Sequence, residues 1–214
     1  MKNTSLCTHQ FFNRLFASLM LITASTAHGI EGNLVVATGK IGKNPQDQSD
    51  IVGRDLNVLG LGALGHVGLW TGDRVIEALN QNPTIVQNTL QDFKSRSSYW
   101  GAVYYPNWNK LPVVWLPSQI WIPYTNVVYS AKVAAVRRAV LIQQIGATYT
   151  MSPSIQVARV QECQGLRCTG PTPGKYRCDT FIKDAYLTAG VGGLSFGTTE
   201  TPSTLWTTYS ERLQ

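Results

Sequence analysis

The sequence predicts an α+β domain in which a small antiparallel sheet packs against a helix that begins at Cys178. Segment 65–79, GHVGLWTGDRVIEAL, has two short apolar strands around Gly72-Asp73, which is a typical hairpin turn. After Cys178, apolar residues recur at helical spacing: Phe181, Ile182, Ala185, Tyr186 and Ala189. Gly190 is expected to end this helix, and a length of 214 residues suits one domain.

The first 27 residues are predicted to be a secretory signal peptide and not part of the fold. Lys2 and Arg14 supply a positive start, residues 15–22 form an apolar core, and Ser25-Thr26-Ala27 is a small-residue cleavage site. The apolar core is too short to span a bilayer stably. We therefore expect a single domain over residues 28–214, secreted or exported to a periplasm.

Between the signal and the Cys178 helix, several further elements are expected. A short apolar run predicts a strand over 33–37. Two more, over 102–105 and 112–116, fall in region 80–125, which shows the least regular pattern. A helix is expected over 130–145, with Ser130 as N-cap and Arg137-Arg138 facing water. The tail from 196 to 214 is polar, and Trp206 and Tyr209 are expected to dock it.

The cysteines point to one free thiol. Cys7 leaves with the signal, so the exported chain keeps Cys163, Cys168 and Cys178. In an oxidising compartment an odd number indicates one disulfide plus a leftover thiol, or an intermolecular bridge. Cys163 and Cys168 are the near pair, which leaves Cys178 at the helix start, where helix N–H groups stabilise a thiolate. A buried structural cysteine is the alternative.

The net charge and the composition limit the classes of partner that the protein is expected to bind. The formal charge is +6, and removal of Lys2 and Arg14 with the signal leaves +4. This mild excess fits weak association with a membrane surface or an anionic cell-wall polymer. No run of Lys or Arg suggests nucleic acid. A zinc site would need more ligands than the two histidines that survive processing, and no metal or organic cofactor is expected.

A catalytic cysteine needs a base and a group that orients the base. His66 is the only internal histidine. With Gly72-Asp73 as the turn, Gly68 lies opposite Glu77, so His66 and Glu77 become diagonal neighbours on one sheet face, about 7 Å apart. Glu77 would then orient the His66 ring from the edge of a cleft, where a carboxylate makes few packing contacts. A surface hairpin with an unrelated His and Glu is the alternative.

These residues resemble a known family. GHVGLWTGDRVIEA is similar to the histidine motif of NlpC-type cell-wall cysteine peptidases, which are papain-like, and YRCDTFIKDAYLTAGV resembles the helix that opens with their nucleophile. Because His66 precedes Cys178, the order resembles the circularly permuted branch, which includes the lecithin:retinol acyltransferase group. Segment 145–149, IGATY, is similar to the Gly-x-x-Tyr that often precedes the cysteine there.

The resemblance implies a permuted papain-like fold and a cysteine hydrolase that cleaves amide bonds through a thioester. Cys178 would be the nucleophile, His66 the base and then the acid, and Glu77 the orienting group. Peptidoglycan stem peptides or small amino-acid amides are the implied substrates. Asp179 stands where the family commonly has Ser; it either opposes the thiolate or points outward and favours the first helical turn.

Two alternatives remain open at this point. One is a lipid-directed acyltransferase or thioesterase, with an apolar entrance built by the tryptophans at 100, 108, 115 and 121. The other is a non-enzymatic binding module on the same scaffold. The oligomeric state is not determined by the sequence.

Overall fold

The computed structural model describes residues 42–56, 64–118, 126–152, 154–160, 162–164, 167–194 and 201–212. The chain separates into two units, Met1–Leu34 and Val35–Gln214, and every described residue belongs to the second. The predicted signal peptide and the predicted strand over 33–37 therefore lie outside the described residues. No helix within the described ranges is both long enough and apolar enough to cross a bilayer.

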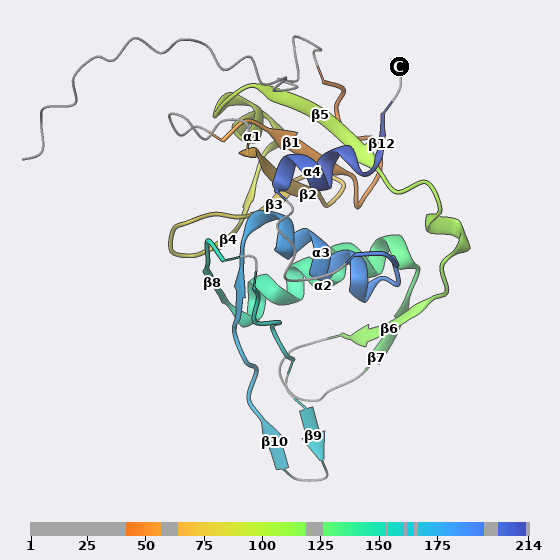
Figure 1. Cartoon of the computed structure of the whole chain (residues 1–214). Helices are drawn as coiled ribbons and strands as arrows, with labels where there is room; N and C mark the ends of the chain where they lie inside the picture. Colours follow the sequence, from red (N-terminus) through yellow and green to blue (C-terminus); the bar gives the residue numbers. More distant parts are fainter. Residues whose placement is uncertain are drawn as a thin grey trace, which may run out of the picture. The chain divides into compact units, whose positions relative to one another are not determined.

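A six-stranded sheet forms the centre of the described part of the chain (Figure 1). Its order is β12-β5-β1-β2-β3-β4, and every neighbouring pair is antiparallel. The strands are β1 (Ile51–Arg54), β2 (His66–Trp70), β3 (Val75–Ala78), β4 (Ile85–Asn88), β5 (Tyr99–Tyr104) and β12 (Ser210–Glu211). Together with the helices this confirms the predicted α+β class.

The β2–β3 hairpin has the predicted register. Trp70 pairs with Val75 and Leu69 with Ile76, and the Thr71 N–H donates to the carbonyl of Arg74 at 2.8 Å. Gly72 has φ +114°, a conformation that L-residues with a side chain rarely adopt. The turn therefore depends on glycine at this position, and the hairpin prediction is confirmed.

The two faces of the sheet are covered differently. α2 (Ala131–Ile145), α3 (Cys178–Thr188) and α4 (Pro202–Thr207) contact strands of the sheet, and their apolar residues share one core with Val67, Leu69 and Ile76. A second, smaller cluster forms around Phe93 of α1 (Leu90–Ser95), with Val52 and Val75. Because side chains alternate along a strand, these two sets belong to opposite faces.

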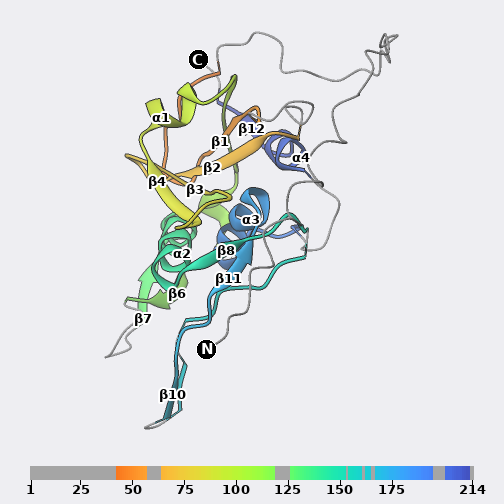
Figure 2. The same cartoon turned by 90° about the vertical axis from the view of Figure 1, so that its left-hand side faces the viewer.

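α2 and α3 lie side by side (Figures 1 and 2) and are joined by a buried ion pair. Nε and Nη2 of Arg138 donate to the two carboxylate oxygens of Asp184 at 2.9 and 2.8 Å, and the Tyr176 hydroxyl donates to Asp184 at 2.5 Å. Arg138 is only 7% exposed. The expectation that Arg138 faces water is therefore wrong: its position on the apolar side of α2 is satisfied by a carboxylate from the neighbouring helix.

The region expected to be least regular contains β4, α1, β5 and the short helix η2 (Trp108–Lys110). The sequence analysis missed α1, although Thr89 and Asp92 form a reciprocal capping box at its N-terminus. The described part of the chain contains three two-stranded sheets besides the six-stranded sheet: β6 (Val114–Pro117) with β7 (Asn126–Tyr129), β8 (Ala147–Tyr149) with β11 (Gly174–Tyr176), and β9 (Glu162–Gln164) with β10 (Arg167–Thr169). The β9–β10 hairpin projects from the rest of the described chain in both views (Figure 2).

The expected helix over 130–145 is α2, with Ser130 in the N-cap position. The predicted helix after Cys178 is α3, and Gly190 follows it with φ +89°. The polar tail is more ordered than expected, because it contains α4 and β12. Trp206 is 7% exposed and packs against Trp100 with ring centroids 5.8 Å apart, so its docking role is confirmed.

The Arg138–Asp184 pair gives a stability prediction. Asp184→Ala leaves the Arg138 guanidinium buried without its counter-charge, so the free energy of unfolding should fall by about 3–5 kcal/mol in denaturant titrations. Lys132→Ala is the control, because its pair with Asp47 (3.4 Å) is partly exposed and should contribute less than about 1 kcal/mol. Equal losses in the two variants would contradict the assignment.

Candidate active site

Cys178 is the first residue of α3 and follows directly on β11 and Arg177. The Thr180 hydroxyl accepts a hydrogen bond from the Arg177 N–H at 2.8 Å, which fixes the turn into the helix. The thiol is 2% exposed and is a free cysteine. At this position the N–H groups of the first helical turn and the positive end of the helix dipole favour a thiolate.

His66 and Glu77 are brought together as the hairpin register predicts. His66 is the first residue of β2, Glu77 lies in β3, and His66 Nε2 is 2.6 Å from Glu77 Oε2. His66 is 3% exposed and Glu77 is fully buried. The predicted diagonal placement is confirmed, and the alternative of an unrelated surface His and Glu is not what the structure has.

Glu77 is held by more groups than His66 alone. Asn88 Nδ2 donates to Oε1 at 2.6 Å, Arg96 Nη1 lies 3.4 Å from the same oxygen, and Arg54 Nη2 lies 3.7 Å from Oε2. Burial alone would raise the pKa of Glu77, but the hydrogen bonds and charges of its partners outweigh burial, and the pKa lies below the usual value. Glu77 is therefore a fixed negative charge, not the cleft-edge residue with few contacts that was expected.

The His66 ring also interacts with Cys178. Burial disfavours the charged ring, but the charge and hydrogen bond of Cys178 and those of Glu77 outweigh burial and raise the pKa of His66 to about 9. Because Nε2 is bound to Glu77, Nδ1 is the nitrogen left for the thiol. The arrangement therefore favours the imidazolium form of His66 at neutral pH.

Tyr149 also belongs to this group. β8 carries Tyr149 beside Tyr176 of β11, two residues before Cys178. Burial raises the pKa of Tyr149, and the negative charge of Cys178 raises it further. The phenol thus stays protonated near the thiol, where it can donate a hydrogen bond. This is the tyrosine of the IGATY segment noted in the sequence.

The negative charge of Asp179 is balanced by the neighbouring Arg177. It is fully buried, and its two carboxylate oxygens accept hydrogen bonds from Nε and Nη2 of Arg177 at 2.6 and 2.7 Å. The expectation that Asp179 either opposes the thiolate or points outward is replaced by a third arrangement. The Arg177 guanidinium balances the carboxylate and also interacts favourably with the Cys178 charge.

No family model, curated protein or solved structure matches this chain. The chemistry of the site therefore rests on the geometry of its own residues.

Sequence reasoning missed the cations that surround Glu77. Arg54 is 4% exposed and its guanidinium lies 5.0 Å from the centre of the Phe93 ring. Burial lowers the pKa of Arg54, while the charges of Glu77 and Cys178 oppose that effect. The available signal was weak: Arg54 ends the apolar run Ile51-Val52-Gly53, and it pairs with His66 across β1 and β2. Asn88 and Arg96 gave no signal, because they reach Glu77 only in the folded chain.

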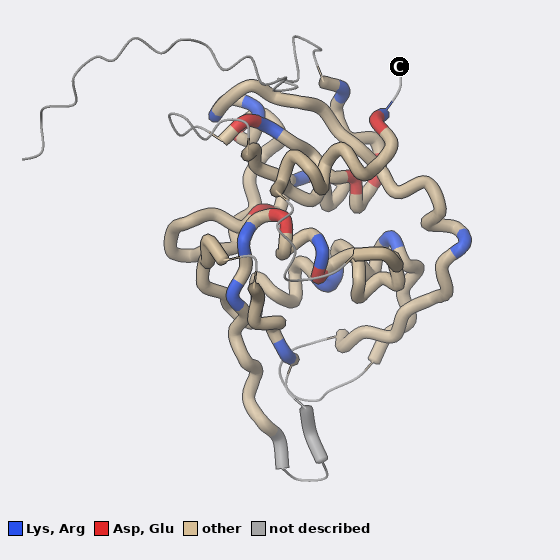
Figure 3. Tube along the Cα trace, in the orientation of Figure 1, with Lys and Arg blue, Asp and Glu red and all other residues tan. Residues whose placement is uncertain are grey.

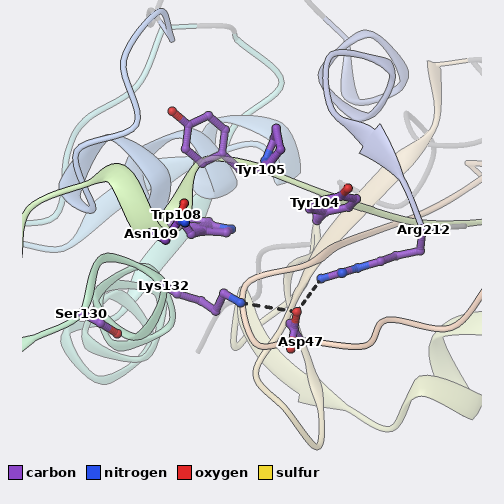
Figure 4. Close-up of a pocket in the computed structure, with 9 residues that line it drawn as sticks. Asp47, Tyr104, Tyr105, Trp108, Asn109, Ser130, Lys132 and Arg212 are labelled. Carbon is purple, nitrogen blue, oxygen red and sulfur yellow. Dashed lines mark hydrogen bonds and ion pairs between the residues drawn. The ribbon is translucent and has the colours of Figure 1, made fainter.

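A hollow of about 510 Å³ lies elsewhere, lined by residues that include Asp47, Trp108, Lys132 and Arg212 (Figure 4). Cys178, His66 and Glu77 are not among the residues that line it. Within the hollow, Asp47 forms ion pairs with Lys132 and Arg212. No group of three or more potential metal ligands occurs within the described residues.

The predicted Cys163–Cys168 disulfide lies at a place where only the backbone is described. The two residues are directly opposite each other in the β9–β10 register. Directly opposite residues have Cβ atoms about 4.5–5.5 Å apart, somewhat farther than the 3.5–4.5 Å of a disulfide. The bridge stays a prediction.

The ion pair predicts how His66 titrates. Its pKa of about 9 exceeds the usual 6.5, so the stability that it contributes is complete below pH 6.5 and is lost as the pH rises toward 9. Cys178→Ala removes the thiolate charge, and the pKa of His66 should fall. The ring proton can be followed by NMR titration and assigned by its loss in His66→Gln. An unchanged pKa in Cys178→Ala would show that the thiol and the ring are not coupled.

Proposed function

We propose that this protein is an exported cysteine hydrolase that cleaves amide bonds through a thioester intermediate, on a circularly permuted papain-like fold of the NlpC type. The observation that carries the proposal is His66, a buried ring that is bound to the buried carboxylate of Glu77 at 2.6 Å and whose pKa is raised by the charge and hydrogen bond of Cys178 together with those of Glu77. A nucleophile, a base and a group that orients the base are the three parts that acyl transfer to a thiol needs.

The reaction follows from these roles. The Cys178 thiolate attacks the amide carbonyl, and the negative charge that develops on the carbonyl oxygen is stabilised by the Cys178 N–H at the start of α3 and by the protonated Tyr149 phenol. The His66 imidazolium gives its proton to the leaving amine, and the thioester forms. Neutral His66 then takes a proton from water, which attacks the thioester; the acid and the Cys178 thiolate are released, and His66 is again an imidazolium.

The surrounding charges support this cycle. Glu77 stabilises the imidazolium and fixes the orientation of the ring, while Arg54 and Arg177 interact favourably with the thiolate. We propose stem peptides of peptidoglycan or small amino-acid amides as substrates, because the resemblance of the two motifs to cell-wall peptidases favours them.

The lipid-directed alternative receives no support from its expected tryptophan entrance. Trp100 and Trp108 are 8% and 9% exposed, and Trp108 packs against Tyr186. Trp115 is exposed on β6, and Trp121 lies outside the described residues. Amide hydrolysis therefore remains the proposed function.

The purified exported protein should release soluble peptides from peptidoglycan, or amines from amino-acyl amides, as measured by chromatography and mass spectrometry of the products. Cys178→Ala should lose this activity and keep its fold, because Ala also fits the helix start. The Cys178→Ala variant also controls for contaminating hydrolases. Release of fatty acid from lipids without action on amides would move the function to the acyltransferase alternative.

A further inference from the structure

The outer face of the β6–β7 hairpin is apolar and exposed. Val113, Trp115 and Val128 are 60%, 65% and 42% exposed. Trp115 lies directly opposite Val128 in the register, and Val113 precedes Trp115 by two residues, so all three share one face. On the other face, Leu116 is 8% exposed and belongs to the main core. The hairpin is thus anchored on its inner side and presents a small apolar surface on its outer side.

The size of this surface decides what kind of partner it fits. A specific protein–protein interface buries at least about 1,000 Å² with good shape complementarity. Three side chains on a hairpin whose two strands have four residues each provide only a fraction of that area. A bilayer interface needs no complementary shape, and tryptophan is enriched there because its ring is apolar while its N–H remains hydrated.

The charge around the hairpin fits an anionic surface. Residues 93–161 contain no Asp or Glu, and the tube of Figure 3 carries no acidic residue along β6 and β7. Lys110 is exposed and precedes Val113 by three residues. Arg137 donates a hydrogen bond to the carbonyl of Ser118, at the end of β6, which places a second cation beside the hairpin.

We propose that the β6–β7 hairpin docks the protein on an anionic phospholipid bilayer. Val113, Trp115 and Val128 enter the interface, and Lys110 and Arg137 lie at the level of the headgroup phosphates. This inference is independent of the proposed hydrolase activity, because it uses none of the residues of the Cys178 site.

The test is co-sedimentation with large vesicles of phosphatidylcholine alone or with one third phosphatidylglycerol. Every form of the protein begins at residue 28, so the signal segment does not contribute. Binding to the anionic vesicles should exceed binding to the neutral ones by about tenfold and weaken in high salt. The double variant Val113→Ser/Trp115→Ser should bind the anionic vesicles about tenfold less, and Lys110→Glu should also weaken binding.

Met151→Ser is the matched control, because Met151 is 66% exposed and lies outside the hairpin, and it should bind as the parent does. The substitutions at Val113, Trp115, Lys110 and Met151 are at exposed positions, so thermal unfolding of these variants should be unchanged. Cys178→Ala should bind normally, which separates this inference from the hydrolase proposal. Undiminished binding by the double variant, or no binding to anionic vesicles, would overturn the inference. So would a dimer that light scattering detects and that the double variant abolishes, since the occupant would then be a second copy.

Discussion

Glu77 places a negative charge inside the sheet with no exposed surface. A buried carboxylate is tolerated only when hydrogen bonds and opposite charges replace the water that it loses. Here the replacements come from four separate segments: His66 at the start of β2, Asn88 at the end of β4, Arg54 at the end of β1 and Arg96 just after α1. The carboxylate thus depends on the assembly of the sheet, and the buried Arg54 depends on the carboxylate.

This dependence has a consequence for the chemistry. A ring that is bound through Nε2 to a fixed carboxylate is held in one orientation, and its other nitrogen is left for a second partner. The raised pKa of His66 means that this environment stabilises the charged form of the ring over the neutral form. In the proposed mechanism the reactivity of Cys178 therefore follows from a structural constraint, since the buried charge that stabilises the sheet would also hold the base.

The hairpin and α3 could be predicted because their signals are local. Gly72-Asp73 sets the register, and the register alone places His66 near Glu77. Arg138 was predicted to face water because arginine usually does, and only the long-range contact with Asp184 reverses that. Likewise, no local pattern around Asn88 or Arg96 in the sequence predicts that these side chains contact Glu77. Buried polar networks join residues that are far apart in the chain. Local patterns therefore predict the central His66–Glu77 pair but not the more distant residues that bind Glu77.

The pH dependence of Cys178 alkylation tests the central claim most directly. Native protein is treated with iodoacetamide between pH 4 and 9, and the labelled peptides are quantified by mass spectrometry. The account predicts rapid labelling of Cys178 near pH 6, with Cys163 and Cys168 unreactive until reduction. In Glu77→Gln the acid limb should move to higher pH, because the imidazolium loses its counter-charge. Labelling that falls first on Cys163 or Cys168, or an identical profile in Glu77→Gln, would contradict it.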